Sequence, residues 1–162
     1  MKKINVTIIC AGAEEYPGCG DLLEDCPEIS IVARTGGLYE PGSWAALGGS
    51  DILLLDEATI EQDGLDVILS VHDCHPLLRS LLIMENFNKN MAMSALSRGI
   101  RGVMERTATV SGLRKAIAAI YTGEAWLSRG FVEPLRNELC YMEKKLHWEN
   151  QSLVQGRWEK MN

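Results

Sequence analysis

The chain has 162 residues, of which 46% are hydrophobic, and a formal net charge of −6. This length suits one domain with an appendage, and the hydrophobic content is sufficient for a packed core. The negative charge argues against a broad nucleic-acid-binding surface. No N-terminal stretch resembles a signal peptide and no apolar run approaches the ~20 residues of a membrane span, so we expect a cytoplasmic protein without membrane contact.

The cysteine content favours reduced thiols. The number is odd and no pair has CxxC spacing, which argues against both a disulfide framework and a zinc site. The three histidines are not at metal-ligand spacing with acids or thiols, so we expect no metal. The cysteines are Cys10, Cys19, Cys26, Cys74 and Cys140.

Short apolar, β-rich runs alternate with helical patterns in the first part of the chain. Strands are predicted at Ile4–Ile9, Ile29–Ala33, Asp51–Asp56, Ser80–Met84 and Arg101–Glu105. Between them, helices are predicted to end at Asp21–Cys26, to form around Trp44–Leu47, to include Leu65, Ile68 and Leu69, and to span Asn88–Arg98 and Thr109–Tyr121.

Five strand–helix alternations predict an α/β fold of the (βα)5 doubly wound, flavodoxin-like type. The strands are expected in a parallel sheet of order 2-1-3-4-5 with right-handed crossovers. In such sheets the site lies beyond the carboxyl ends of the strands. Asp56 directly follows the apolar run Ile52–Leu55, so we expect its carboxylate at that edge.

Residues 128–162 are expected to form one long C-terminal helix. Its apolar residues recur at spacings of 4, 4, 3, 4 and 7, which is close to a heptad seam. The helix either folds back on the domain as an amphipathic helix or pairs with a second chain. Pro134 fits only near its start. The seam residues are Phe131, Leu135, Leu139, Met142, Leu146 and Leu153.

Several segments resemble a receiver domain of response regulators, and more closely the subfamily with a C-terminal LuxR/NarL-type helix-turn-helix. The resemblance covers residues 4 to about 129, and we assign 1–127 to a CheY-like, receiver-like domain. The spacing from Asp56 to Asp63-Gly64 matches that from the phosphoacceptor to the family's Asp-Gly turn. The other matching segments are Leu22–Glu24 with Pro27–Ile29, Ala95–Gly102, and Leu113 to Gly123-Glu124.

The departures from this family concern its chemistry. Phosphoryl transfer to the strand-three Asp needs Mg²⁺, which the family holds with an acidic pair after strand one. Here Cys10 and Ala11 occupy those positions, so Mg²⁺ is not expected. Met84 falls at the position of the strand-four Ser or Thr, and Arg106 at that of the strand-five Lys. Glu14 and Glu15 could substitute as metal ligands, although a solvated loop is the simpler interpretation.

Asp56 therefore has two interpretations. It is either a weak or vestigial phosphoacceptor, or a strand-end carboxylate that caps the following loop or pairs with Arg106. The departures favour the second, and with it a pseudo-receiver that is not an enzyme. The alternatives are a phosphorylatable receiver served by a histidine kinase and a protein-interaction module without any ligand.

Residues Trp126-Leu127-Ser128-Arg129 match the W-[FLM]-[ST]-R pattern of biofilm regulators with degenerate receivers, which bind cyclic di-GMP and dimerise. The Trp could stack on guanine, and the Ser and Arg could bond to phosphate or a guanine edge. Alternatively, as in ordinary members of the subfamily, the Trp covers the core and the Arg begins the linker.

The resemblance implies a regulatory module of a transcription factor that acts as a homodimer. The subfamily's DNA-binding helices would begin where this chain ends, at Asn162. We therefore expect a helix-turn-helix domain in the full-length protein and no direct binding of nucleic acid by residues 1–162.

Overall fold

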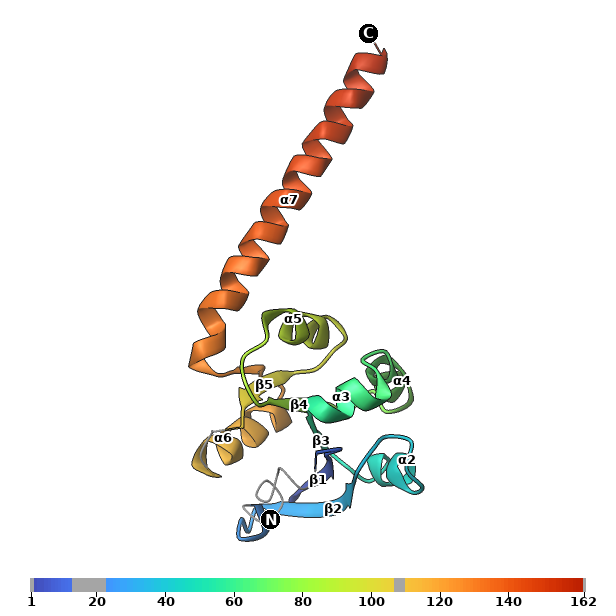
Figure 1. Ribbon diagram of the computed structural model, residues 1–162, viewed down its shortest axis with the longest axis vertical. Coiled ribbons are helices and arrows are strands. Elements are labelled where there is room, and N and C mark those ends of the chain that lie inside the picture. Colours follow the sequence, from blue (N-terminus) through green and yellow to red (C-terminus); the bar gives the residue numbers. More distant parts are fainter. Residues whose placement is uncertain (1, 13–22, 107–109, 162) are drawn as a thin grey trace. The chain divides into compact units, whose positions relative to one another are not determined.

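The computed structural model describes residues 2–12, 23–106 and 110–161, with the backbone alone for 157–161. The chain divides into two compact units, Met1–Ser128 and Arg129–Asn162. Figure 1 shows the first as a sheet with helices around it, and the second as a single long helix. No helix in the described part of the chain is both long and apolar enough to cross a membrane.

The first unit is built on a six-stranded sheet in which all pairings are parallel. The strand order is β2-β1-β3-β4-β5-β6, so the predicted order 2-1-3-4-5 is confirmed, and a sixth strand extends it. The strands are β1 (Ile4–Ile9), β2 (Ile29–Thr35), β3 (Ile52–Asp56), β4 (Arg79–Met84), β5 (Gly102–Glu105) and β6 (Trp126–Leu127).

The helices follow the predicted alternation. They are α2 (Ser43–Leu47), α3 (Glu57–Asp63), α4 (Val67–Cys74), α5 (Lys89–Ser97) and α6 (Val110–Tyr121). Leu113, Ala116, Ile117 and Ile120 of α6 join a core cluster with alternate residues of β1, β3 and β4. Helix α6 lies on one side of the sheet, and α2 and α4 lie on the other (Figure 1).

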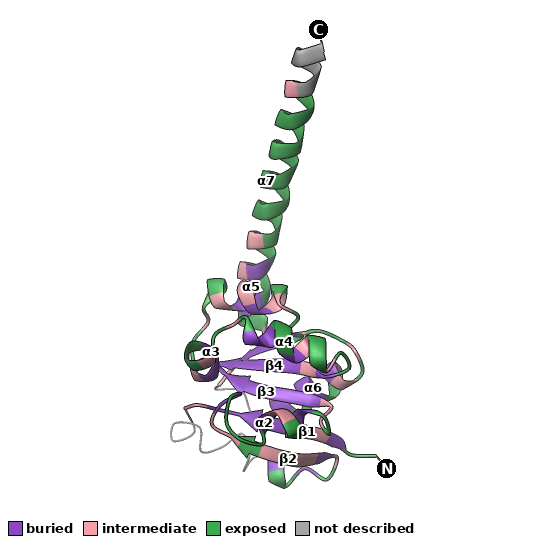
Figure 2. Ribbon diagram, turned by 90° about the vertical axis from the view of Figure 1, so that its right-hand side faces the viewer, coloured by how far each residue is buried: buried purple, intermediate pink, exposed green. Residues whose placement is uncertain are grey.

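The central strands β3 and β4 consist of nearly continuous apolar residues because both faces of the sheet are buried there. All five residues of β3, Asp56 included, are buried, and so are the last five of β4. In Figure 2 the central strands β3 and β4 are purple, whereas much of the edge strand β2 is pink or green. Asp56 is therefore an acidic group at the end of an otherwise apolar buried strand.

Two features differ from the sequence-based expectation. A helix, α3, begins immediately after Asp56, where no helix was predicted before Leu65. Residues 126–127 form the edge strand β6, which pairs with Gly102 and Val103 of β5, whereas no strand was expected there. Of the helix end predicted at Asp21–Cys26, residues 21 and 22 lie outside the described part of the chain, whereas Leu23 and Glu24 are helical.

The second unit is α7, Arg129–Met161, which confirms the predicted C-terminal helix. At 33 residues it is about 50 Å long. Pro134 lies inside the helix, five residues after its start. From residue 136 to 155 most side chains are exposed, and several of these are large and apolar.

Candidate functional site

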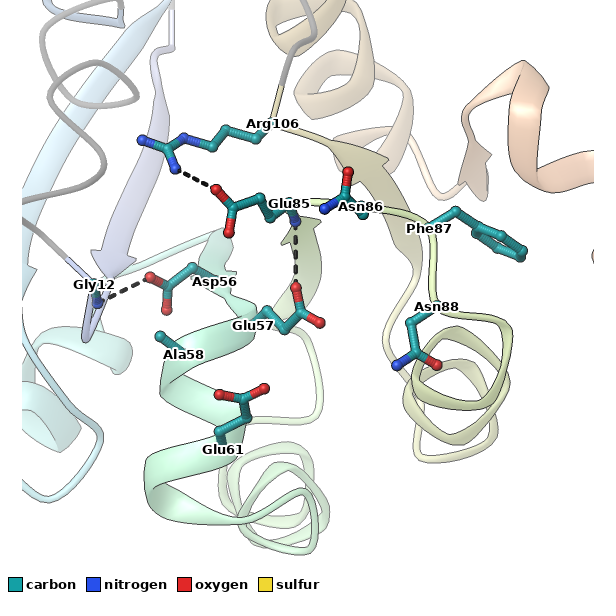
Figure 3. Close-up of a pocket in the computed structure, with 10 residues that line it drawn as sticks. All are labelled: Gly12, Asp56, Glu57, Ala58, Glu61, Glu85, Asn86, Phe87, Asn88 and Arg106. Carbon is teal, nitrogen blue, oxygen red and sulfur yellow. Dashed lines mark hydrogen bonds and ion pairs between the residues drawn. The ribbon is translucent and has the colours of Figure 1, made fainter.

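A pocket lies at the carboxyl ends of the parallel strands, the edge where open α/β sheets bind ligands. Its volume is about 410 Å³. The lining residues come from the end of β1, from β3 and α3, and from the segments that follow β4 and β5 (Figure 3). They are Gly12, Asp56, Glu57, Ala58, Glu61, Glu85, Asn86, Phe87, Asn88 and Arg106.

The carboxylate of Asp56 is buried and its oxygens accept several hydrogen bonds. Asp56 is 1% exposed and is the N-cap of α3. Oδ1 accepts from the backbone N–H of Thr59 at 2.9 Å and of Ala11 at 3.3 Å. Oδ2 accepts from the backbone N–H of Gly12 at 3.1 Å. The carboxylate thus joins the end of β1 to the first turn of α3.

Thr59 adds a second connection between the same two segments. Its side chain is fully buried, and its hydroxyl bonds to Asp56 Oδ1. The same Oγ1 accepts from the N–H of Ala11 at 2.9 Å and lies 3.1 Å from the carbonyl oxygen of Ile9. Sequence analysis missed this residue, although a hydroxyl three positions after an N-cap acid was the available signal.

The end of β1 contributes backbone groups to the site. Cys10 is buried at 6% exposure, and its N–H donates to the carbonyl oxygen of Thr35. Ala11 acts through its N–H and presents only a methyl group as a side chain. Glu14 and Glu15, considered above as substitute metal ligands, lie outside the described residues.

An ion pair joins the ends of β4 and β5. Arg106 Nη1 lies 3.0 Å from Glu85 Oε1, and Figure 3 shows both side chains on the rim above Asp56. Asp56 caps the segment that follows it, here helix α3, as one of its two interpretations predicts. Met84, expected at the site, is fully buried and does not line the pocket, while the next residue, Glu85, does.

The pocket carries four carboxylates and one guanidinium. The carboxylates are Asp56, Glu57, Glu61 and Glu85, and the guanidinium belongs to Arg106. The N–H of Glu85 also donates to Glu57 Oε2 at 3.3 Å. An excess of negative charge disfavours a phosphate-bearing ligand here. Within the described residues, no three His, Cys, Asp or Glu side chains are grouped so that they could hold a metal ion.

The donor set therefore does not fit Mg²⁺ as the receiver family binds it. That family uses an acidic pair after strand one together with the strand-three Asp, and here the pair is Cys10 and Ala11. The remaining oxygen ligand, the Asp56 carboxylate, already accepts from backbone amides and from Thr59.

The residues of the WLSR tetrapeptide are not among those that line this pocket. Trp126 is half-buried and packs against the core cluster. Its N–H donates to Arg101, and the N–H of Ser128 donates to Val103. Leu127 pairs with Val103 in β6, and Arg129 is exposed at the first position of α7. Trp126 thus covers core residues, as in the simpler of the two interpretations.

No protein-family model matches this sequence, and no curated protein matches it. Solved structures do match. A two-component response regulator of the LuxR family from Aurantimonas sp. SI85-9A1 is 17% identical, with a TM-score of 0.73 over 86% of this chain and 99% of the other.

Two further structures give the same result. The isolated REC domain of RcsB from Salmonella enterica serovar Typhimurium, in the presence of BeF3−, is 19% identical, with a TM-score of 0.66 over 83% of this chain and 99% of the other. The signal receiver domain of NarL from Mycobacterium tuberculosis is 20% identical, with a TM-score of 0.67 over 76% and 100%. The first unit therefore has the CheY-like receiver fold, and its structural neighbours are receiver domains of LuxR/NarL-type response regulators.

Proposed function

We propose that this chain is a regulatory pseudo-receiver that controls dimerisation of a LuxR/NarL-type transcription regulator without Mg²⁺-dependent phosphorylation of Asp56. The observation that carries the proposal is the set of hydrogen bonds around the Asp56 carboxylate. Oδ2 accepts a hydrogen bond from the backbone N–H of Gly12, just after β1. Oδ1 accepts from the backbone N–H and the hydroxyl of Thr59 in the first turn of α3.

Phosphorylation would require Asp56 to act as a nucleophile toward a phosphoryl group. Each donor that now bonds to the carboxylate stabilises its charge and reduces its nucleophilicity. The buried donors would also lose their acceptor if the carboxylate moved, at a cost of roughly 1–3 kcal/mol for each orphaned group. The negative charge of Glu57, Glu61 and Glu85 opposes the approach of an anionic phosphodonor.

The test is treatment of the full chain with acetyl phosphate and Mg²⁺, followed by intact-mass spectrometry. A conventional receiver that phosphorylates itself serves as the positive control. We expect no mass increase on this chain and no change of its oligomeric state with beryllofluoride. A phosphoryl adduct that disappears in Asp56→Asn would overturn the proposal.

That adduct is also the signature of the alternative, a receiver phosphorylated by a histidine kinase. The matched variant is Thr59→Val, which removes the hydroxyl bonded to Asp56 and preserves the shape of the side chain. A phosphoryl adduct in Thr59→Val but not in the parent chain would support the hydrogen bond from Thr59 to Asp56 as the reason why Asp56 is not phosphorylated.

The proposed output of the module is dimerisation. In the full-length protein, this dimerisation would bring together two copies of a DNA-binding domain. RcsB, a structural neighbour, has been described as dimers bound to DNA. For the present chain, dimerisation is supported by the apolar residues exposed on α7. A ligand-free interaction module would share this pairing but lack a helix-turn-helix domain in the parent protein.

Cyclic di-GMP is the proposed input, on the basis of the WLSR tetrapeptide. Calorimetric titration of the chain beside Trp126→Ala and Arg129→Ala tests it. Binding that both substitutions abolish supports the nucleotide as the input. Because Trp126 packs on the core, each variant needs a check of its fold by circular dichroism. Absence of binding at high ligand concentration removes this ligand from the proposal.

A further inference from the structure

Apolar side chains are exposed along α7 at seven-residue intervals. Val132, Leu139, Leu146 and Leu153 are 42%, 56%, 58% and 68% exposed. Met142, three residues after Leu139, is 46% exposed. A helix turns about 100° per residue, so positions seven apart fall on nearly one line, with i+3 beside it. These five residues therefore form one exposed stripe, which we call the Leu146 stripe.

We propose that the Leu146 stripe pairs with the same stripe of a second copy, with the two α7 helices parallel and in register. The inference rests on the dimer in the proposed function, and it names the face, the orientation and the residues that set the strength of pairing. In this arrangement each leucine meets its own counterpart, as at the first core position of a parallel coiled coil.

The opposite face of α7 is less suited to self-pairing. Tyr141 and Trp148 are exposed there, 63% and 70%, but Lys144 and Lys145 lie between them in the sequence. Pairing this face with its copy would bring four ammonium groups together, which is destabilising. The Leu146 stripe contains no lysine.

The charges beside the stripe predict that pairing is weak. With Leu139 and Met142 at the two core positions of a heptad, the next core position after Leu146 is Glu149. Parallel pairing brings two Glu149 carboxylates into one layer. It also places Glu138 opposite Glu143 of the partner copy, because flanking positions five residues apart face each other across a parallel coil. Like charges at these places oppose association.

A weak interface suits a module whose dimerisation is controlled. Four residues of the stripe lie in the exposed part of the helix from 136 to 155, whereas stable coiled coils use three to four heptads or more. They are Leu139, Met142, Leu146 and Leu153. The association constant of the dimer then depends on these few residues, so single substitutions in the stripe should change it measurably.

The first experiment is sedimentation equilibrium of the full chain over a wide concentration range. Leu146→Asp is expected to weaken dimerisation about tenfold or more, because a carboxylate enters an apolar layer. Tyr141→Asp is the matched control, since it introduces the same group at an equally exposed position on the opposite face. We expect less than about twofold change for it. Circular dichroism verifies that both variants keep their helix content.

The second experiment looks for gain of association, which misfolding would not produce. Glu149→Leu is expected to tighten the dimer about tenfold, because it replaces a charged layer by an apolar one. Glu143→Lys is expected to tighten it as well, since Glu138 then faces an ammonium group. An antiparallel pairing centred near residue 144 would bring position 143 close to itself, and Glu143→Lys would bring no gain.

The inference is overturned if the chain stays monomeric at all concentrations, if Tyr141→Asp disrupts the dimer as strongly as Leu146→Asp, or if Glu143→Lys fails to tighten it. Its failure can be distinguished from failure of the proposed function. An inert Asp56 together with a dimer that the stripe variants leave unchanged removes this inference alone. A chain that stays monomeric also removes dimerisation from the proposed function, and a phosphoryl adduct on Asp56, which is read by mass, removes the pseudo-receiver.

Discussion

Thr59 bonds through its side-chain hydroxyl to the carboxylate of Asp56, one helical turn before it, while its Oγ1 accepts the N–H of Ala11. Both side chains are almost fully buried. A single threonine and a single aspartate thereby fasten the end of β1 to the start of α3. The strand-end carboxylate is therefore a structural link at the carboxyl edge of the sheet.

The first prediction concerns that link. Asp56→Ala removes the N-cap of α3 and leaves the N–H groups of Gly12 and Thr59 without their acceptor. The free energy of unfolding should fall by about 3 kcal/mol, and by about 1–2 kcal/mol in Thr59→Val. Urea denaturation measures both. Thr59→Ser keeps the hydroxyl and is the control, so an equal loss there would contradict the role of the hydrogen bond.

A second prediction concerns the ion pair between Glu85 and Arg106. The Glu85 side chain is 61% exposed, so water and salt screen the pair. Glu85→Gln should change the free energy of unfolding by less than about 1 kcal/mol, far less than Asp56→Ala. The measurement is urea denaturation at low and high salt. A loss as large as that of Asp56→Ala would show that the pair is structural.

His72 gives a prediction for pH. Burial lowers its pKa below the ordinary 6.5, against the opposing effects of a backbone hydrogen bond at Leu78 and the charge of Asp73. The ring Nε2 lies 3.3 Å from the hydroxyl of buried Ser80. Below pH 6.5 the unfolded chain binds more protons at this residue than the folded chain, so stability falls as the pH decreases through that value.

The measurement for His72 is the free energy of unfolding between pH 7.5 and 5 for the parent chain and for His72→Gln. The difference between the two should change with pH as histidine becomes protonated in the unfolded state. Identical pH profiles would show that burial does not affect the charge of this ring.

The fourth prediction compares two glycines. A Cβ at Gly102 in β5 would lie 2.6 Å from Ile120 Cδ1 and 2.9 Å from Leu81 Cδ1. Gly102→Ala should therefore cost about 1–3 kcal/mol through overpacking. At Gly156 in α7 a Cβ meets nothing within 4 Å, so Gly156→Ala should stabilise α7 by about 0.5–1 kcal/mol. Thermal denaturation followed by circular dichroism measures both, and a harmless Gly102→Ala would contradict the packing.

Much of the fold follows from local sequence patterns. The apolar run before Asp56 and the helical spacing of Leu113, Ile117 and Ile120 depend on periodicity and burial, which a sequence displays directly. These patterns determined the parallel α/β class and the long C-terminal helix. The position of Asp56 at the carboxyl edge also followed, because strand direction is uniform in a parallel sheet.

The partners of the site residues depended on tertiary structure. The sequence put Asp56 and Arg106 at the same edge, but only the folded chain pairs Arg106 with Glu85 and gives Asp56 the amides of Ala11 and Gly12. Hydrogen bonds between residues more than forty positions apart leave no periodic signal in the sequence. They depend on the exact register of β1 beside β3, which packing of both sheet faces decides.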